Sequence, residues 1–388
     1  MIGVGPFATD TYIAALPALQ RSLQTTAGTA QLTLTAFLVG LAAGQLAVGP
    51  VSDGRGRRGP LLVSTAVFAV TSLLCALAPS GPALVAIRLV QGLAAGGGVA
   101  VGRAVVGDRY SGKEAAARFA TLAAVFFLGP VVAPAVGAVL LAVGSWRVVF
   151  VGLAVLGVAM LAAVALGVPE TLPPQRRQGS GFADTAARMA DLLGDRVFLR
   201  HVLVQCLAAA GFFTYIGGSS FVLQTAYGAS PSRYALVFAT NAAAMAAASA
   251  LARLVVPRTG PAPLRLAGLL LSAAGSAGLL ALAVADPAAR GPLALPWALL
   301  AVAVAGMGLS APATMALAQE AGRRSGGTAS ALQGGLTFAA GAAATPLSGL
   351  LGADRLLPLA ASMAVFFAAA LVLLVATRRI GDARPAPA

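Results

Sequence analysis

Charged residues are scarce in this chain. They make up 10% of its 388 residues, whereas hydrophobic residues make up 59%, and a soluble domain is usually about one quarter charged. A water-soluble fold needs a polar surface that this composition cannot supply, and a disordered chain needs low hydrophobicity with high charge. With a mean hydropathy of +0.88, the chain is predicted to be a polytopic membrane protein.

Reactive side chains are also scarce, since the chain has two cysteines and one histidine. Cys75 and Cys206 each lie in an apolar run, so they offer neither a disulfide framework nor a thiolate metal site. An integral-membrane enzyme would need clustered carboxylates and histidines. A nucleotide-driven pump would need a G-x-x-x-x-G-K-[ST] loop, and the sole lysine, Lys113, does not belong to one. We therefore expect no enzymatic activity, no metal and no cofactor.

Long apolar runs dominate the sequence instead. A membrane-spanning helix needs roughly 20 mostly apolar residues, and twelve such runs are separated by polar or Gly/Pro-rich breaks. They lie near residues 2–20, 30–50, 60–79, 82–106, 119–143, 148–168, 201–224, 233–255, 264–284, 293–318, 327–351 and 357–377. The predicted fold class is therefore an all-α integral membrane protein with twelve transmembrane helices.

One long polar stretch divides these spans into two halves. We predict an N-terminal six-helix bundle at 1–168, a connector at 169–200, a C-terminal six-helix bundle at 201–379 and a tail at 380–388. Within the connector, Phe182, Ala186, Met189 and Leu193 share one helical face, which predicts an amphipathic helix along the membrane surface. Two six-helix bundles are typical of transporters built from repeats, with the substrate site between the halves.

The distribution of basic residues predicts the orientation. With the N-terminus inside, cytoplasmic loops and tail hold eighteen of the 26 Lys and Arg residues and the outer loops hold five. Basic residues favour the cytoplasmic side of short loops, so both termini are predicted to be cytoplasmic. The same distribution explains the net charge of +14 without a nucleic-acid partner.

Two charged residues lie inside predicted spans, where a charge costs about 2.5–3.5 kcal/mol. Asp10 lies roughly 13 Å along the first span, and a buried carboxylate can exchange a proton near neutral pH. Alternatively, the first helix lies less deep in the membrane and Asp10 is at its solvent-exposed end. Arg88, in the fourth span, shares a helical face with Gln91. Arg88 is either the counter-charge of Asp10 or a structural arginine satisfied by backbone carbonyls and Gln91.

The loop after the second span runs from Gly49 to Arg58 and includes Asp53 and Arg57. An acid at a helix C-terminus opposes the helix macrodipole, so Asp53 needs a partner. The start of the eleventh span, Gly326 to Thr328, is a candidate. Such a pairing would form a cytoplasmic latch.

The fifth span combines two prolines with spaced glycines. Gly129, Ala133 and Gly137 recur every four residues and predict close packing against another helix. Pro130 and Pro134 each remove a backbone hydrogen bond, so the span is either a simple packing element or a kinked element that controls how the halves rock.

The remaining site candidates are aromatic and polar. His201 is expected to be a solvated residue at the start of the seventh span. The candidates for lining a substrate cavity are Tyr12, Gln91, Tyr215, Ser219 and Asn241.

These residues resemble the major facilitator superfamily over essentially the whole chain, and more closely the bicyclomycin-resistance (Bcr/CflA) type of drug:proton antiporter. The matching segments are Asp10-Thr11-Tyr12 with Ala15-Leu16-Pro17, Gly49 to Arg58, Arg88-x-x-Gln91-Gly92, Gly129-Pro130-x-x-x-Pro134-x-x-Gly137, Glu170-Thr171-Leu172 and Gly217 to Gln224. The resemblance implies two pseudo-symmetric bundles and proton-driven drug export by alternating access. It also implies that Asp10 is the protonatable group, Arg88 its partner, and Gly129 with Pro130 the exchange-type element.

The predicted function is proton-coupled multidrug efflux across the cytoplasmic membrane of a bacterium, with the proton gradient as the energy source. The alternative is an exporter or symporter for a single metabolite, because a fold does not fix substrate or direction. The expected partners are small molecules, protons and the lipid bilayer, and the expected oligomeric state is a monomer.

Overall fold

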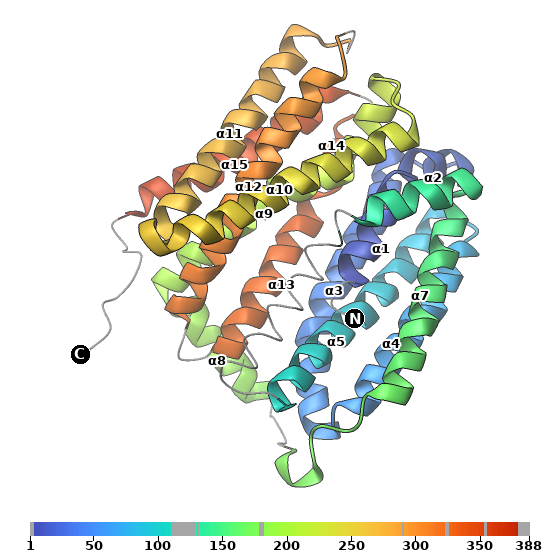
Figure 1. Ribbon diagram of the computed structural model, residues 1–388, viewed down its shortest axis with the longest axis vertical. Coiled ribbons are helices and arrows are strands. Elements are labelled where there is room, and N and C mark those ends of the chain that lie inside the picture. Colours follow the sequence, from blue (N-terminus) through green and yellow to red (C-terminus); the bar gives the residue numbers. More distant parts are fainter. Residues whose placement is uncertain are drawn as a thin grey trace. The chain divides into compact units, whose positions relative to one another are not determined.

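The computed structural model describes residues 4–109, 129, 132–177, 182–288, 291–322, 326–352 and 355–378. The regular elements in these ranges are all helices (Figure 1). The chain divides into two compact units, Met1–Phe182 and Ala183–Ala388. The division falls inside the predicted connector at 169–200.

Nine helices among the described residues are long and apolar enough to cross a membrane. In the first unit they are α3 (Ala27–Arg55), α4 (Arg58–Ala76), α5 (Gly81–Arg109) and α7 (Trp146–Gly167). In the second unit they are α9 (Arg196–Phe221), α10 (Pro231–Thr259), α11 (Pro261–Ala285), α12 (Ala294–Ala321) and α15 (Leu356–Ala376). Each of these helices overlaps one of the predicted spans.

The first predicted span is interrupted by a short break and forms two helices. The chain forms α1 (Val4–Ile13) and α2 (Leu16–Ser22), with Pro17 in the first turn of α2. Proline has no N–H to donate and its ring crowds the carbonyl four residues back, so the helix is interrupted before it. The eleventh span is divided in the same way, into α13 (Gly326–Ala344) and α14 (Leu347–Leu350), around Pro346.

Residues 119–128, 130 and 131 of the fifth predicted span, 119–143, lie outside the described residues. Its last part, Val132–Val143, is an apolar helix.

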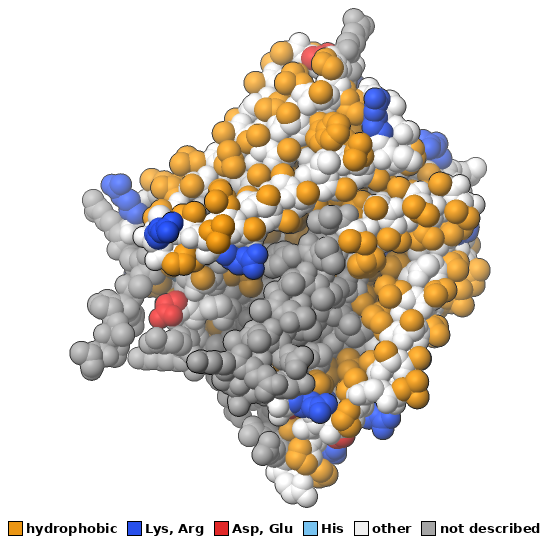
Figure 2. Space-filling model, viewed as in Figure 1, with side chains coloured by type: hydrophobic (Ala, Val, Ile, Leu, Met, Phe, Trp, Pro, Cys, Tyr) orange, Lys and Arg blue, Asp and Glu red, His pale blue; other side chains and the backbone are white. Residues whose placement is uncertain are grey.

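The long helices are apolar on their outer faces as well as inside. On α7, Val149, Phe150 and Leu153 are buried, whereas Val155 is 65% and Leu166 is 90% exposed. Hydrophobic side chains cover much of the visible surface in Figure 2, with Lys and Arg side chains in small groups. A helix that is apolar all round fits a lipid environment.

Glycines allow the helix backbones to touch inside each unit. A Cβ atom on Gly40 of α3 would lie 2.1 Å from the Leu89 carbonyl oxygen, and one on Gly92 of α5 would lie 2.0 Å from the Phe37 carbonyl oxygen. Interfaces of small residues are typical of membrane helices, because close approach maximises van der Waals contact. This contact between α3 and α5 fixes the position of Arg88, one turn before Gly92.

The connector contains the predicted helix. It is α8 (Phe182–Gly194), preceded by a short helix, η1 (Pro174–Arg176). Leu192 and Met189 pack into an apolar cluster with Phe198 of α9, while Leu193 is 40% exposed. Part of the apolar face therefore meets protein, and its placement along the membrane surface stays a prediction.

Candidate functional site

Arg88 is the centre of a buried polar cluster in the first unit. Its side chain is 0% exposed. The guanidinium carbon lies 4.2 Å from the ring centre of Phe37 on α3, 4.6 Å from Tyr12 on α1 and 5.7 Å from Phe150 on α7. A cation over aromatic faces gains about 2 kcal/mol or more where water is excluded. The aromatic rings therefore stabilise the charge that the sequence places inside the fourth span.

Hydrogen bonds tie this cluster to four helices. Arg88 Nη1 donates to Gln91 Oε1 at 2.7 Å, which confirms the predicted pairing, and Gln91 Nε2 donates to Ser72 Oγ of α4 at 2.7 Å. Arg88 Nε donates to the Thr33 carbonyl oxygen at 3.3 Å, and the Tyr12 hydroxyl lies 3.0 Å from Thr33 Oγ1. Tyr12 and Gln91 are both fully buried in this arrangement.

Asp10 is buried on α1 but does not touch Arg88. Its side chain is 5% exposed, and the Thr9 hydroxyl donates to Asp10 Oδ1 at 2.8 Å. In the described part of the chain, neither Asp10 nor Arg88 takes part in an ion pair. Asp10 and Tyr12 are two residues apart, so they project from the helix about 200° apart. Arg88 contacts the opposite face of α1, and its role as counter-charge stays a prediction.

The spaced glycines of the fifth span pack against the helix that carries Asp10. A Cβ atom on Gly137 would lie 2.0 Å from the Thr11 carbonyl oxygen, and one on Gly129 would lie 2.5 Å from Pro6 Cβ. The prediction of close packing at these glycines is confirmed, and the partner is α1. Pro134 is buried, and Pro130 lies outside the described residues. The gating role of this span stays a prediction.

The predicted cavity residues of the second unit come together between α9 and α10. Asn241 Nδ2 donates to the Tyr215 hydroxyl at 3.2 Å, and the Ser219 hydroxyl lies 3.1 Å from that of Tyr234. The Tyr215 ring is stacked on Phe238, with ring centres 5.6 Å apart and planes 9° apart. Tyr215, Ser219 and Asn241 are at most 2% exposed.

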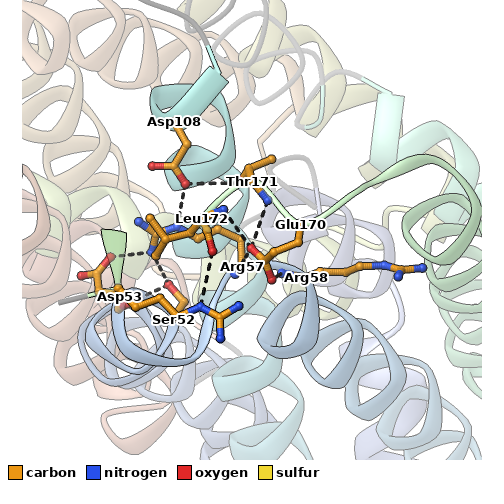
Figure 3. Close-up of polar contacts among 10 residues, drawn as sticks. Ser52, Asp53, Arg57, Arg58, Asp108, Glu170, Thr171 and Leu172 are labelled. Carbon is orange, nitrogen blue, oxygen red and sulfur yellow. Dashed lines mark hydrogen bonds and ion pairs between the residues drawn. The ribbon is translucent and has the colours of Figure 1, made fainter. Parts of the chain in front are cut away.

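The loop between α3 and α4 is organised by Arg57 (Figure 3). Its Nε donates to Asp108 Oδ2 of α5 at 2.8 Å, and its Nη1 donates to Ser52 Oγ at 2.7 Å and to Asp53 Oδ1. Asp53 therefore finds a partner four residues further along the chain. Ser52 Oγ in turn donates to the Gly49 carbonyl oxygen at 2.7 Å. The predicted gating residues of this loop form one network, and the latch itself stays a prediction.

Glu170 is the member of this network that residue-by-residue reasoning missed. It follows α7, and its carboxylate accepts the backbone N–H groups of Arg57 at 2.8 Å and Arg58 at 3.2 Å, at the start of α4. Burial raises the pKa of Glu170, but hydrogen bonds from the backbone of Arg57, Leu172, Arg58 and Thr171 together lower it below the ordinary value of 4.5. The sequence feature that could have indicated it is the N-cap of α4, which is not Asp, Asn, Ser or Thr. A helix that begins without such a residue needs an acceptor from another part of the chain.

A carboxylate at a helix N-terminus satisfies free N–H groups and complements the macrodipole. The next residue, Thr171, donates from Oγ1 to Asp108 Oδ2 at 3.2 Å. The segment after α7 therefore joins the start of α4 and the end of α5 in one polar cluster. A further hydrogen bond joins α4 to α7 itself, since Arg58 Nη2 donates to the Ala165 carbonyl oxygen of α7 at 2.9 Å.

His201 is not the solvated residue that the sequence predicts. It is 0% exposed, and Arg265 Nη1 of α11 lies 2.8 Å from His201 Nδ1. The neighbouring Arg200 donates to Thr377 Oγ1 and to the Leu374 carbonyl oxygen at the end of α15. The prediction failed because α9 begins at Arg196, five residues before the predicted span, which places His201 inside the helix packing.

Comparison with known proteins identifies the family. The Major Facilitator Superfamily matches residues 2–346. The transporter YdgK of Bacillus subtilis (strain 168), named as an uncharacterized MFS-type transporter, is 35% identical over 354 residues, or 89% of this chain and 86% of the relative.

Two further relatives have names that refer to drugs. The chloramphenicol resistance protein of Pseudomonas aeruginosa is 32% identical, over 66% of this chain and 61% of the relative. The bicyclomycin resistance protein homolog of Haemophilus influenzae is 28% identical, over 66% of this chain and 64% of the relative. Each of these two alignments spans less than two thirds of the relative's own length.

Solved structures share the fold at low sequence identity. The xylose transporter XylE from E. coli, in a partially occluded inward open conformation, has a TM-score of 0.73 and 14% identity, over 100% of this chain and 97% of that chain. A bacterial homolog to the human lysosomal transporter Spinster has a TM-score of 0.76 and 17% identity, over the same shares of the two chains.

The fold, the apolar spans and these matches define a multi-pass membrane transporter of small molecules, not an enzyme. The chain belongs to the Major Facilitator Superfamily, and the predicted fold class is confirmed. The resemblance to Bcr/CflA-type drug exporters is also confirmed, since the relatives include resistance proteins of that type.

Proposed function

We propose that the chain exports drugs or other small amphipathic molecules across the bacterial cytoplasmic membrane in exchange for protons. The resistance proteins among its relatives support drug export. The observation that carries proton coupling is Asp10, the one carboxylate within a predicted span, which is 5% exposed and accepts a hydrogen bond from Thr9.

The mechanism follows from the cost of burying that charge. An ionised carboxylate in low-dielectric surroundings is expensive, and uptake of a proton removes the expense. The ionised form of Asp10 therefore favours polar surroundings for α1, whereas the protonated form tolerates apolar ones. Because the fifth-span glycines pack directly on α1 beside Asp10, a change in α1 is passed to that helix. Arg88 acts from the other face of α1, through its contact with the Tyr12 ring.

The test is drug-triggered proton movement in liposomes. The purified full chain is reconstituted with a trapped pH-sensitive dye, a proton gradient is imposed, and a panel of antibiotics and cationic dyes is added. We expect drug-linked proton flux in the wild type and a loss of at least about tenfold in Asp10→Asn, which cannot exchange a proton. Asp191→Asn, which changes an exposed carboxylate on α8, is the matched control and should keep the flux.

Coupled flux that survives in Asp10→Asn would contradict the assignment of the coupling site. A wild type that transports drugs without proton movement would contradict the coupling, and a wild type without any drug-linked flux would favour the single-metabolite transporter.

A further inference from the structure

The second unit contains a continuous series of aromatic contacts whose buried end lies beside the side chain of Asn241. Neighbouring ring centres lie 5.6 to 6.1 Å apart. In order of contact, the rings are those of Phe338 on α13, Phe213, Phe212 and Tyr215 on α9, and Phe238 and Tyr234 on α10. We call this series the aromatic strip.

The two ends of the aromatic strip differ in exposure. Phe212, Phe213 and Phe338 are half-buried, whereas Tyr215 and Tyr234 are 2% and Phe238 is 4% exposed. The strip therefore leads from a partly accessible end to a buried end. Aromatic faces of this kind favour flat aromatic molecules through offset stacking and edge contacts.

Asn241 lies at the buried end, one turn after Phe238 on α10. Its Nδ2 donates to the Tyr215 hydroxyl at 3.2 Å, but its Oδ1 has no hydrogen-bond partner within the described part of the chain. Asn241 is 0% exposed. A buried acceptor without a partner costs free energy, because its desolvation is not repaid by a hydrogen bond, and such groups are few in native structures. A transporter that binds its substrate here would recover that energy.

We propose that Asn241 Oδ1 accepts a hydrogen bond from an N–H or O–H group of the transported substrate, whose aromatic body packs along the aromatic strip. The inference rests on the proposed export function and names a substrate class for it: flat aromatic amphiphiles that carry a hydrogen-bond donor. Carbonyl groups and fully alkylated aromatic amines carry no N–H or O–H at that position, so they leave Oδ1 unpaired and bind more weakly.

The probes are two cationic dyes, of which one carries hydrogen-bond donors at its terminal nitrogens and the other does not. Rhodamine 123 carries N–H groups at both ends of its flat ring system, and tetramethylrhodamine methyl ester carries methyl groups there, while both are cations. Binding to the purified full chain in lipid nanodiscs is followed by fluorescence polarisation. Because the dyes also differ in size and hydrophobicity, the quantity that tests the inference is the change in their affinity ratio on substitution.

Asn241→Leu removes the acceptor at similar volume. We expect it to weaken rhodamine 123 binding about three- to tenfold relative to tetramethylrhodamine methyl ester, the equivalent of one hydrogen bond. Asn241→Asp keeps a side-chain oxygen and should keep the wild-type ratio. Ser276→Ala is the control, since that buried serine bonds to the backbone of its own helix and the substitution should not change the ratio.

An affinity ratio that is the same in wild type and Asn241→Leu would overturn the inference, and so would the absence of binding of both dyes to the wild type. Thermal unfolding of each variant shows whether the fold is kept. The result is independent of the proton-coupling test at Asp10, because binding in nanodiscs needs no gradient. If proton coupling fails but Asn241→Leu still changes the affinity ratio of the two dyes, the proposed function is contradicted. If proton coupling is found but the affinity ratio does not change, this inference is contradicted.

Discussion

At the scale of single residues, the charge of Arg88 is stabilised by aromatic rings. Among the described residues no carboxylate pairs with it, and its surroundings are the rings of Tyr12, Phe37 and Phe150. Tyr12 contributes in two ways, through its ring and through its hydroxyl bond to Thr33. These two contributions can be separated by substitution.

We expect the ring of Tyr12 to matter more than its hydroxyl. Tyr12→Phe should lower the free energy of unfolding by under about 1 kcal/mol, because Thr33 Oγ1 already donates to the Ala30 carbonyl oxygen at 2.6 Å. Tyr12→Leu should lower it by about 2–3 kcal/mol, since it removes a cation–π contact and the ring packing on Phe150. Thermal unfolding of the purified variants measures both. Equal losses in the two variants would mean that the hydroxyl is the main contribution.

At the scale of elements, α4 is stabilised at both ends by charges from the region of α7. Arg147, at the start of α7, donates to the carbonyl oxygens of Ala76 and Ala78 at 3.4 Å, at the end of α4. Glu170, after the end of α7, accepts from the first N–H groups of α4. The two helices are antiparallel, so each charge has the sign that complements the macrodipole of α4.

The Glu170 contribution should depend on pH with a definite sign. Its pKa is lower in the folded protein than the ordinary value of 4.5, so the folded state favours the ionised form and gains stability above that value. This gain is lost as the pH falls through the folded-state pKa. We expect Glu170→Gln to be less stable than wild type at pH 7, by about 0.5 kcal/mol because the carboxylate is exposed to solvent.

The difference between wild type and Glu170→Gln should therefore shrink on acidification below about pH 4.5 and vanish below the folded-state pKa. Thermal unfolding across a pH series measures it. Asp191→Asn, on the exposed side of α8, should show no such pH-dependent difference. If the stability difference between wild type and Glu170→Gln stays constant down to low pH, the loss of the carboxylate charge is not the cause of that difference.

At the scale of the whole molecule, side-chain contacts show which loops share a side within each unit. Arg57 after α3, Asp108 at the end of α5 and Glu170 after α7 belong to one network, so they lie on one side. Arg147 at the start of α7 contacts the end of α4, so these two helix ends lie on the opposite side of the unit. In the second unit, Arg200 at the start of α9 contacts Thr377 after α15. These contacts agree with the alternation of sides predicted from the apolar runs.

The sequence predicted those parts of the fold that depend on local composition. The apolar runs predicted the nine spans, and the spacing of Arg88 and Gln91 by three residues predicted that they share a helical face, where the structure has their hydrogen bond. Contacts between distant segments were not predictable, because no local pattern specifies a partner. The Glu170 cap on α4, the burial of His201 against Arg265 and the aromatic surroundings of Arg88 all depend on such contacts.

Contacts within a unit give relative sides but not which side is the cytoplasm. That assignment depends on the eighteen basic residues in one set of loops against five in the other, because basic loops are retained on the cytoplasmic side. We expect a green fluorescent protein fused to the C-terminus to fluoresce in intact cells. Alkaline phosphatase needs disulfides that form outside the cytoplasm, so it should be active when fused after Ala288 and inactive when fused after Gly260. The reverse activities would mean that the charge distribution does not orient this chain and that Glu170 and Arg57 lie on the outer face.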